Sequence, residues 1–295
     1  MVNPASDQAA GLRRMMRGRG LQIVSFIAGC SGIGRSLAIA NIGTALARQG
    51  KEVLIIDENA AHDDIASTFG LCAQQNLLHV IEHQQKLERV LLSPLPGLRL
   101  LPASEAITKL GQLTPRQQNA FIEAMASLSP PVDVILINSG ICEPSGISPL
   151  GLAAIEHIAV VSPANAHSIT EAYSLIKKTS QSFARKEFKI LVTKVRNSDE
   201  ATGVYNNLAS VARAQGVARL EYAGHIPLDH SLREASRLRL SVFNCAPNSP
   251  AALSLKQIAN DIQLRRIDFP PIESIRHFAQ QLIHLSQRIT TPHYS

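Results

Sequence analysis

The chain contains no tryptophan, and only 4% of its 295 residues are aromatic. Proteins that bind single-stranded nucleic acid stack bases on aromatic side chains, so direct nucleic-acid binding is not expected. The four cysteines, Cys30, Cys72, Cys142 and Cys245, form no Cys-x-x-Cys pair. This spacing argues against a disulfide framework and against a zinc site, and it suits a reducing compartment.

Long apolar runs are also missing. No stretch reaches the roughly 18 apolar residues that a membrane span needs. The first residues lack the apolar core of a signal peptide. We therefore expect a cytoplasmic protein that contacts a membrane only peripherally, if at all.

What is present is the composition of a globular protein, with 45% hydrophobic and 18% charged residues. The formal net charge of +6 favours an acidic partner or an anionic surface. Apolar segments of strand length alternate with segments of helical periodicity, which predicts an α/β fold with a mainly parallel central sheet and helices on both faces. The expected strands are 21–28, 52–57, 98–102, 133–138, 157–162, 189–193 and 222–226. The expected helices lie near 36–49, 63–70, 76–91, 115–128, 168–185, 200–215, 231–238 and 249–263.

Both ends of the chain differ from this body. Residues 1–20 are polar and hold four arginines against one acid, so we expect a flexible arm with a glycine hinge. Two prolines at 270 and 271 stop any preceding helix. Residues 272–290 then show the spacing of a separate amphipathic helix. The predicted organisation is an arm over 1–20, a body over 21–269 and a helix over 272–290.

A glycine-containing turn joins the first expected strand to the first expected helix. In a Gly-x-x-x-x-Gly-Lys-[Ser/Thr] loop, backbone N–H groups surround the phosphates, the lysine neutralises them and the hydroxyl holds magnesium. Gly29, Gly34, Arg35 and Ser36 fall on that frame. Arg35 keeps the charge of the lysine without its compact ammonium group. On its own, this loose motif leaves an ordinary strand-turn-helix connection equally open.

Segments along nearly the whole chain resemble the MinD/ParA family of deviant-Walker ATPases, whose loop reads Lys-Gly-Gly-x-Gly-Lys-[Thr/Ser], and in particular its FlhG/FleN-type flagellar-number regulators. The matching segments are 43–57, 98–104, 161–177, Val192-Thr-Lys-Val195, 224–229 and 249–252. The resemblance implies a P-loop fold that binds ATP or ADP with Mg²⁺. The nucleotide-binding residues that it implies are Gly29, Ser31, Gly32, Ile33, Gly34, Arg35, Ser36, Leu37, Asp57 and Lys194, and it places Ser36 and Asn138 beside the metal.

The chain departs from this family where charge is needed. Cys30 stands at the place of the signature lysine, Asn59 at that of the water-positioning aspartate, and Asn138 at that of the aspartate beside magnesium. Phosphoryl transfer depends on positioning and electrostatic stabilisation, and one lost stabilising group costs about 10²–10³ in rate. We therefore expect a pseudo-ATPase with impaired or absent hydrolysis. The backbone cradle could still bind ATP or ADP with weakened magnesium assistance, or the protein could use no cofactor.

The arm carries a second resemblance. Asp7, Gln8, Ala9, Leu12 and Arg13 match the Asp-Gln-Ala-x-x-Leu-Arg motif of flagellar-number regulators. That motif implies stimulation of FlhF, a signal-recognition-type GTPase, with these residues as the contact. The alternative is a disordered basic leader.

Three functions stay open at this stage. The first is a degenerate regulator of flagellar number or placement at the inner face of the cell membrane, at the cell pole, as a monomer or weak homodimer. A flagellar switch or basal-body protein or a transcriptional activator could then be a further partner. The second is an active ATPase that dimerises on ATP and cycles at the membrane, and the third an accessory factor of another polar assembly. The apolar face of 272–290 could meet lipid, a partner groove or the protein's own core.

Overall fold

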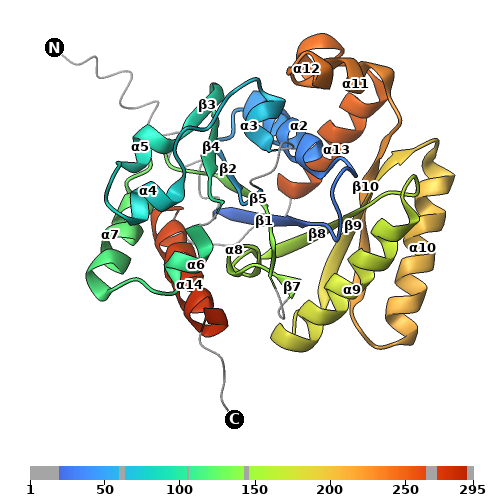
Figure 1. Cartoon of the computed structure of the whole chain (residues 1–295). Coiled ribbons are helices and arrows are strands. Elements are labelled where there is room, and N and C mark those ends of the chain that lie inside the picture. The colour runs from blue at the N-terminus through green and yellow to red at the C-terminus, as the bar shows by residue number, and fades with distance from the viewer. Residues whose placement is uncertain (1–19, 60–63, 105, 143–145, 264–270, 291–295) are drawn as a thin grey trace.

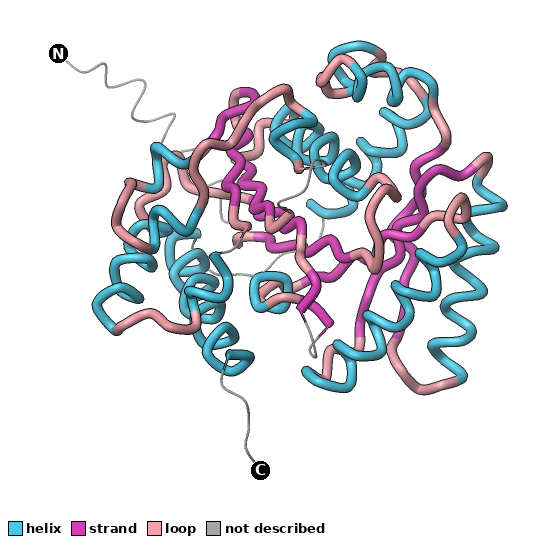
Figure 2. Tube along the Cα trace, in the orientation of Figure 1, coloured by secondary structure: helices cyan, strands magenta, loops and turns pink. Residues whose placement is uncertain are grey.

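The computed structural model describes residues 20–59, 64–104, 106–142, 146–263 and 271–290. The arm motif, from Asp7 to Arg13, lies outside the described residues. Figure 1 shows the arrangement of the elements, and Figure 2 shows the strands as one central layer between helices.

The strands form an eight-stranded sheet in the order β10-β9-β8-β1-β5-β2-β4-β3. All neighbouring pairs are parallel except β3 with β4, which is antiparallel at one edge. The predicted α/β architecture is therefore confirmed. The strands are β1 (Gln22–Ile27), β2 (Val53–Asp57), β3 (Leu92–Leu95), β4 (Leu98–Pro102), β5 (Val134–Asn138), β8 (Glu156–Val161), β9 (Glu187–Val195) and β10 (Arg219–Pro227); a small hairpin pairs β6 (Ile141–Cys142) with β7 (Gly146–Ile147).

Every position of the central strands β2 and β5 is buried, because helices cover both faces of the sheet. On one face, Val134 and Leu136 of β5 pack in a core with α2 and α13; on the other, Ile135 and Ile137 pack in a second core with α7 and α14. The helices are α2 (Arg35–Arg48), α3 (Ile65–Thr68), α4 (Leu77–Ile81), α5 (Leu87–Val90), α6 (Ala106–Leu110), α7 (Pro115–Ala126), α8 (Pro149–Leu152), α9 (Ala166–Phe183), α10 (Ser198–Ala214), α11 (His230–Arg237), α12 (Val242–Cys245), α13 (Pro250–Gln263) and α14 (Pro271–Thr290).

The single helix expected over 76–91 is wrong. The chain forms two short helices, α4 and α5, separated by His83 in the left-handed region at φ 57°. A residue in that conformation ends a helix, and the position is more often taken by glycine. The apolar periodicity continued across the break and hid it.

Helix α14 packs its apolar face against the body, beside α6, α7 and α8 (Figure 1). Ile275, Phe278 and Leu282 are at most 5% exposed. Arg276 on its polar side forms an ion pair with Glu123 of α7. Of the three surroundings that the sequence left open, the structure shows the protein's own core. No helix among the described residues has the length and apolarity to cross a membrane.

Candidate nucleotide-binding site

The loop between β1 and α2 adopts a conformation that requires glycine at several positions. Gly32 and Gly34 have φ of 73° and 90°, in the left-handed region. Gly29 lies against α9, where a Cβ atom would come within 2.2 Å of the Glu171 Cβ. The loop backbone is therefore fixed both by its own turns and by the neighbouring helix.

The N-terminus of α2 faces this loop without a side-chain cap. Gly34 precedes the helix and provides no capping side chain, and the first turn contains no acidic residue. The first helical hydrogen bond runs from the Ala38 N–H to the Gly34 carbonyl at 2.9 Å. The N–H groups of Arg35, Ser36 and Leu37 thus have no acceptor within the helix, and such an end favours an anion.

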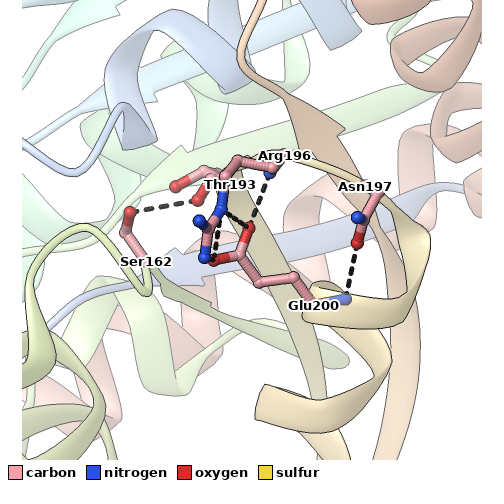
Figure 3. A network of polar contacts seen from close by, with 5 residues as sticks. All are labelled: Ser162, Thr193, Arg196, Asn197 and Glu200. Carbon is pink, nitrogen blue, oxygen red and sulfur yellow. Dashed lines mark hydrogen bonds and ion pairs between the residues drawn. The ribbon is translucent and has the colours of Figure 1, made fainter.

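The end of β9 braces the other side of the loop. The Thr193 hydroxyl donates to the Ile33 carbonyl at 2.6 Å, and the Lys194 Nζ donates to the Gly32 carbonyl at 2.6 Å. Lys194 itself has φ 57°. Figure 3 shows how this strand end is held: the Ser162 hydroxyl donates to the Thr193 carbonyl at 3.0 Å.

The same network continues into α10. Asn197 caps that helix by accepting from the Glu200 N–H at 2.9 Å, and Glu200 pairs with Arg196 (Figure 3). These contacts fix the turn between β9 and α10, and so the position of Lys194. The sequence resemblance includes Lys194 among the nucleotide-binding residues, and the structure places its ammonium group on the loop.

The ends of β2 and β5 form the floor of the site. Asp57 and Asn138 are neighbours in the sheet register. The Asn138 Nδ2 donates to Asp57 Oδ1 at 2.7 Å and to the Ser36 hydroxyl at 3.4 Å. The amide nitrogen must face Asp57, because a carboxylate only accepts hydrogen bonds. The Asn138 Oδ1 is buried and has no hydrogen-bond partner.

Asp57 is engaged from other directions as well. It accepts from the N–H groups of Asn59 at 2.9 Å and Ile65 at 2.7 Å. Burial raises the pKa of Asp57, although these hydrogen bonds act in the opposite direction. Of the neighbouring residues Asp57 and Asn138, only Asp57 is a carboxylate, and both of its oxygens accept hydrogen bonds from the protein itself.

Arg35 extends from the first turn of α2 to the strand ends. Its Nη1 donates to the Ser139 carbonyl at 2.8 Å. Burial lowers the pKa of Arg35, while the nearby carboxylates of Asp57 and Glu58 raise it. An arginine stays protonated in proteins, so a permanent positive charge lies between the loop and the floor.

Glu58 was not singled out from the sequence. Its Oε2 accepts from the Gly140 N–H at 2.8 Å and from the Ser148 hydroxyl. Burial raises the pKa of Glu58 to about 7. The available signal was its place directly after a buried strand, between Asp57 and Asn59, where the polar groups of a parallel sheet gather.

Cys30 occupies the outer side of the loop. Its Sγ accepts from the Asn165 Nδ2 at 3.7 Å. Burial raises the pKa of the Cys30 thiol, with Glu171 adding to the effect. The side chain is therefore a neutral thiol at neutral pH.

The structure brings the predicted site residues together. The loop residues Gly29–Leu37 lie with Asp57, Asn138 and Lys194 at the carboxyl ends of the parallel strands.

Comparison with protein families matches residues 24–242 to the CobQ/CobB/MinD/ParA nucleotide binding domain. Among curated proteins, the antiactivator FleN of Pseudomonas aeruginosa is 27% identical over 263 residues, covering 89% of this chain and 94% of the relative. The flagellum site-determining protein YlxH of Helicobacter pylori is 25% identical over 272 residues, covering 89% and 90%.

Solved structures share the fold at lower identity. The MinD cell division protein of Aquifex aeolicus superposes with a TM-score of 0.63 at 23% identity, covering 83% of this chain and 98% of that one. The septum site-determining protein MinD of Pyrococcus horikoshii, solved with Mg-ADP, gives a TM-score of 0.59 at 20% identity, covering 82% and 96%.

Proposed function

Because this chain belongs to the CobQ/CobB/MinD/ParA family of nucleotide-binding domains, we propose that it is a regulator of flagellar number or placement that binds a nucleotide and hydrolyses it poorly or not at all. The flagellar role is supported by FleN and YlxH, whose similarity extends over almost their whole length. Nucleotide binding is supported by the uncapped start of α2 and the cradle before it.

The observation that carries the loss of hydrolysis is the orientation of the Asn138 amide. Its nitrogen, a hydrogen-bond donor, faces both the Ser36 hydroxyl and Asp57. Magnesium is bound by oxygen ligands, usually one or two carboxylates, and demands near-ideal octahedral geometry. A donor nitrogen between these two oxygens does not fit that ion. A catalytic step that depends on the metal is therefore disfavoured.

Two further positions support the same conclusion. Cys30 offers a neutral thiol where a cation would stabilise transferring phosphate charge. Asn59 holds Asp57 through its backbone N–H and carries an amide rather than a carboxylate. Neither side chain replaces the lost charge.

A phosphate-release assay tests this proposal. We expect no ATP turnover above background from the natural chain, while the triple variant Cys30→Lys, Asn59→Asp, Asn138→Asp gains measurable turnover. Turnover by the natural chain at the rate of active relatives would instead support the second candidate, an ATPase that dimerises on ATP and cycles at the membrane.

We also propose that the arm stimulates an FlhF-type GTPase, with Asp7, Gln8, Ala9, Leu12 and Arg13 as the contact. The support is the sequence motif alone, since these residues lie outside the described part of the chain. In a GTP hydrolysis assay with the full chain, Gln8→Ala with Arg13→Ala should abolish the stimulation. Arg17→Ala, which removes an arginine outside the motif, is the matched control and should stimulate normally.

Other partners follow from the same role. The word antiactivator in the name of FleN supports a transcriptional activator as a partner, and a flagellar switch or basal-body protein is a second one to test. Pull-down of each purified candidate separates them. We place the protein in the cytoplasm, near the cell pole, as a monomer or weak homodimer.

Peripheral membrane contact through α14 would require this helix to leave the body. Ile275, Phe278, Leu282 and Ile283 would then lose their burial, and each large apolar side chain contributes about 1.5–3 kcal/mol when buried. We expect weak binding to anionic vesicles that does not change with nucleotide. Strong nucleotide-dependent sedimentation with vesicles would favour the cycling ATPase.

A further inference from the structure

We propose that the loop binds the free, metal-uncomplexed anion of a nucleoside di- or triphosphate, and that the Arg35 guanidinium and the Lys194 ammonium group are the positive charges that neutralise its phosphates. This inference rests on the proposed nucleotide binding. It concerns the ionic form of the ligand and the residues that neutralise it.

The first step is the balance of charge at the floor. In a site built for magnesium, the ion bridges protein carboxylates and phosphate oxygens, and it offsets their mutual repulsion. Here Asn138 is neutral, and Asp57 accepts hydrogen bonds from three donors: the Asn138 amide and the N–H groups of Asn59 and Ile65. The second carboxylate at the floor, Glu58, accepts from the Gly140 N–H and the Ser148 hydroxyl. Because Asn138 replaces the aspartate that the family resemblance implies, the floor repels the phosphate groups of a nucleotide less, and less positive charge is needed to offset that repulsion.

The second step is the fixed position of Arg35. The hydrogen bond to the Ser139 carbonyl holds its guanidinium between the helix start and the strand ends. An arginine has five N–H donors in a planar fork that matches phosphate oxygens. One of these nitrogens is used by Ser139, which leaves donors for a phosphate group without moving the side chain far.

The third step is the second cation, Lys194. Its ammonium group already lies on the loop, 2.6 Å from the Gly32 carbonyl. Together with Arg35 and the free N–H groups at the start of α2, it surrounds the cradle with positive potential from two sides. Fixed charges of this kind need no ion to be recruited with the ligand.

Calorimetric titration of the full chain with ADP, in EDTA and in excess magnesium, tests this inference. We expect the natural chain to bind in EDTA with an affinity within about threefold of that in magnesium, which corresponds to less than 1 kcal/mol. Loss of binding in EDTA, with binding retained in magnesium, would overturn the metal-free mode and leave the nucleotide site standing. Absence of binding in both conditions would instead remove the nucleotide site itself.

The matched variant is Asn138→Asp, which returns a carboxylate to the floor. We expect magnesium to tighten ADP binding to this variant about tenfold or more, because a carboxylate oxygen then faces Ser36. A folded variant that binds ADP with no response to magnesium would contradict the assignment of the effect to Asn138. If the variant does not fold, the EDTA comparison on the natural chain still decides the proposal.

Discussion

The phosphate loop and the strand ends beneath it, which form the floor of the site, offer a ligand different chemical groups. The loop offers mostly backbone N–H groups, and its shape depends on glycines at 29, 32 and 34. The floor offers side chains, namely Asp57, Glu58, Asn59 and Asn138. The loop has the uncapped helix start that suits an anion, whereas the floor has amides at Asn59 and Asn138, where the family resemblance implies carboxylates. Under the proposed function, this pocket keeps nucleotide binding and loses hydrolysis.

The largest expected effect comes from changing the loop backbone. Gly29→Ala would place a Cβ 2.2 Å from that of Glu171, so the loop or α9 must move. We expect about 100-fold weaker ADP binding and a loss of up to about 3 kcal/mol in stability. Titration and denaturant unfolding measure the two. In the control, Gly203→Ala, the new Cβ meets no atom within 4 Å in α10, and stability should stay the same or rise by up to about 1 kcal/mol.

A smaller effect, dependent on pH, is expected on the floor. Glu58 has an ordinary pKa of 4.5 that rises to about 7 in the folded chain. Between these values the folded state binds a proton that the unfolded state has released, so stability falls as pH rises from 4.5 to 7. Glu58→Gln should reduce this fall by an amount on the order of 2 kcal/mol.

Urea unfolding at several pH values measures the Glu58 effect. Glu88→Gln, on the exposed surface of α5, removes a carboxylate without touching the site and is the control. Parallel stability curves for the natural chain and Glu58→Gln across this pH range would contradict the prediction.

The smallest effect should come from the brace between loop and β9. Thr193→Val removes a buried hydroxyl that donates to the Ile33 and Val161 carbonyls. We expect a loss of about 1 kcal/mol in stability and a few-fold loss of nucleotide affinity. The control is Thr202→Val, which makes the same replacement of a hydroxyl by a methyl group at an exposed position of α10, away from the loop. Equal effects of the two variants on affinity would show that the brace does not position the loop.

The fold could be predicted because strands buried on both faces are continuously apolar, and the helices between them are amphipathic. The break at His83 could not, since the left-handed residue is not a glycine and the apolar spacing continues past it. The placement of α14 was also undecided. An apolar face with this spacing suits a lipid surface, a partner or a core equally well, and only tertiary packing distinguishes them.

The candidate site divides in the same way. The loop positions Gly29, Gly34, Arg35 and Ser36 were predicted from the loop motif, and Asp57, Asn138 and Lys194 from the family resemblance. The contacts that give the site its character depend on which strands are neighbours. Asn138 reaches Asp57 because β2 and β5 pair in register, although the two residues are 81 positions apart. Thr193 and Ser139 were missed because their partners lie on other segments. Glu58 was missed although its place directly after a buried strand was a local signal, because its partners Gly140 and Ser148 are also distant in sequence.

The packing of α14 also bears on the order in which the chain folds. Phe121 and Met125 of α7 are buried in the core that contains Phe278 and Leu282 of α14. During translation α7 is synthesised well before α14. The face of the sheet that carries α7 therefore keeps its apolar surface exposed until α14 has left the ribosome. Nascent chains in that interval are exposed to aggregation, and truncations before Pro271 should be recovered mainly as insoluble material.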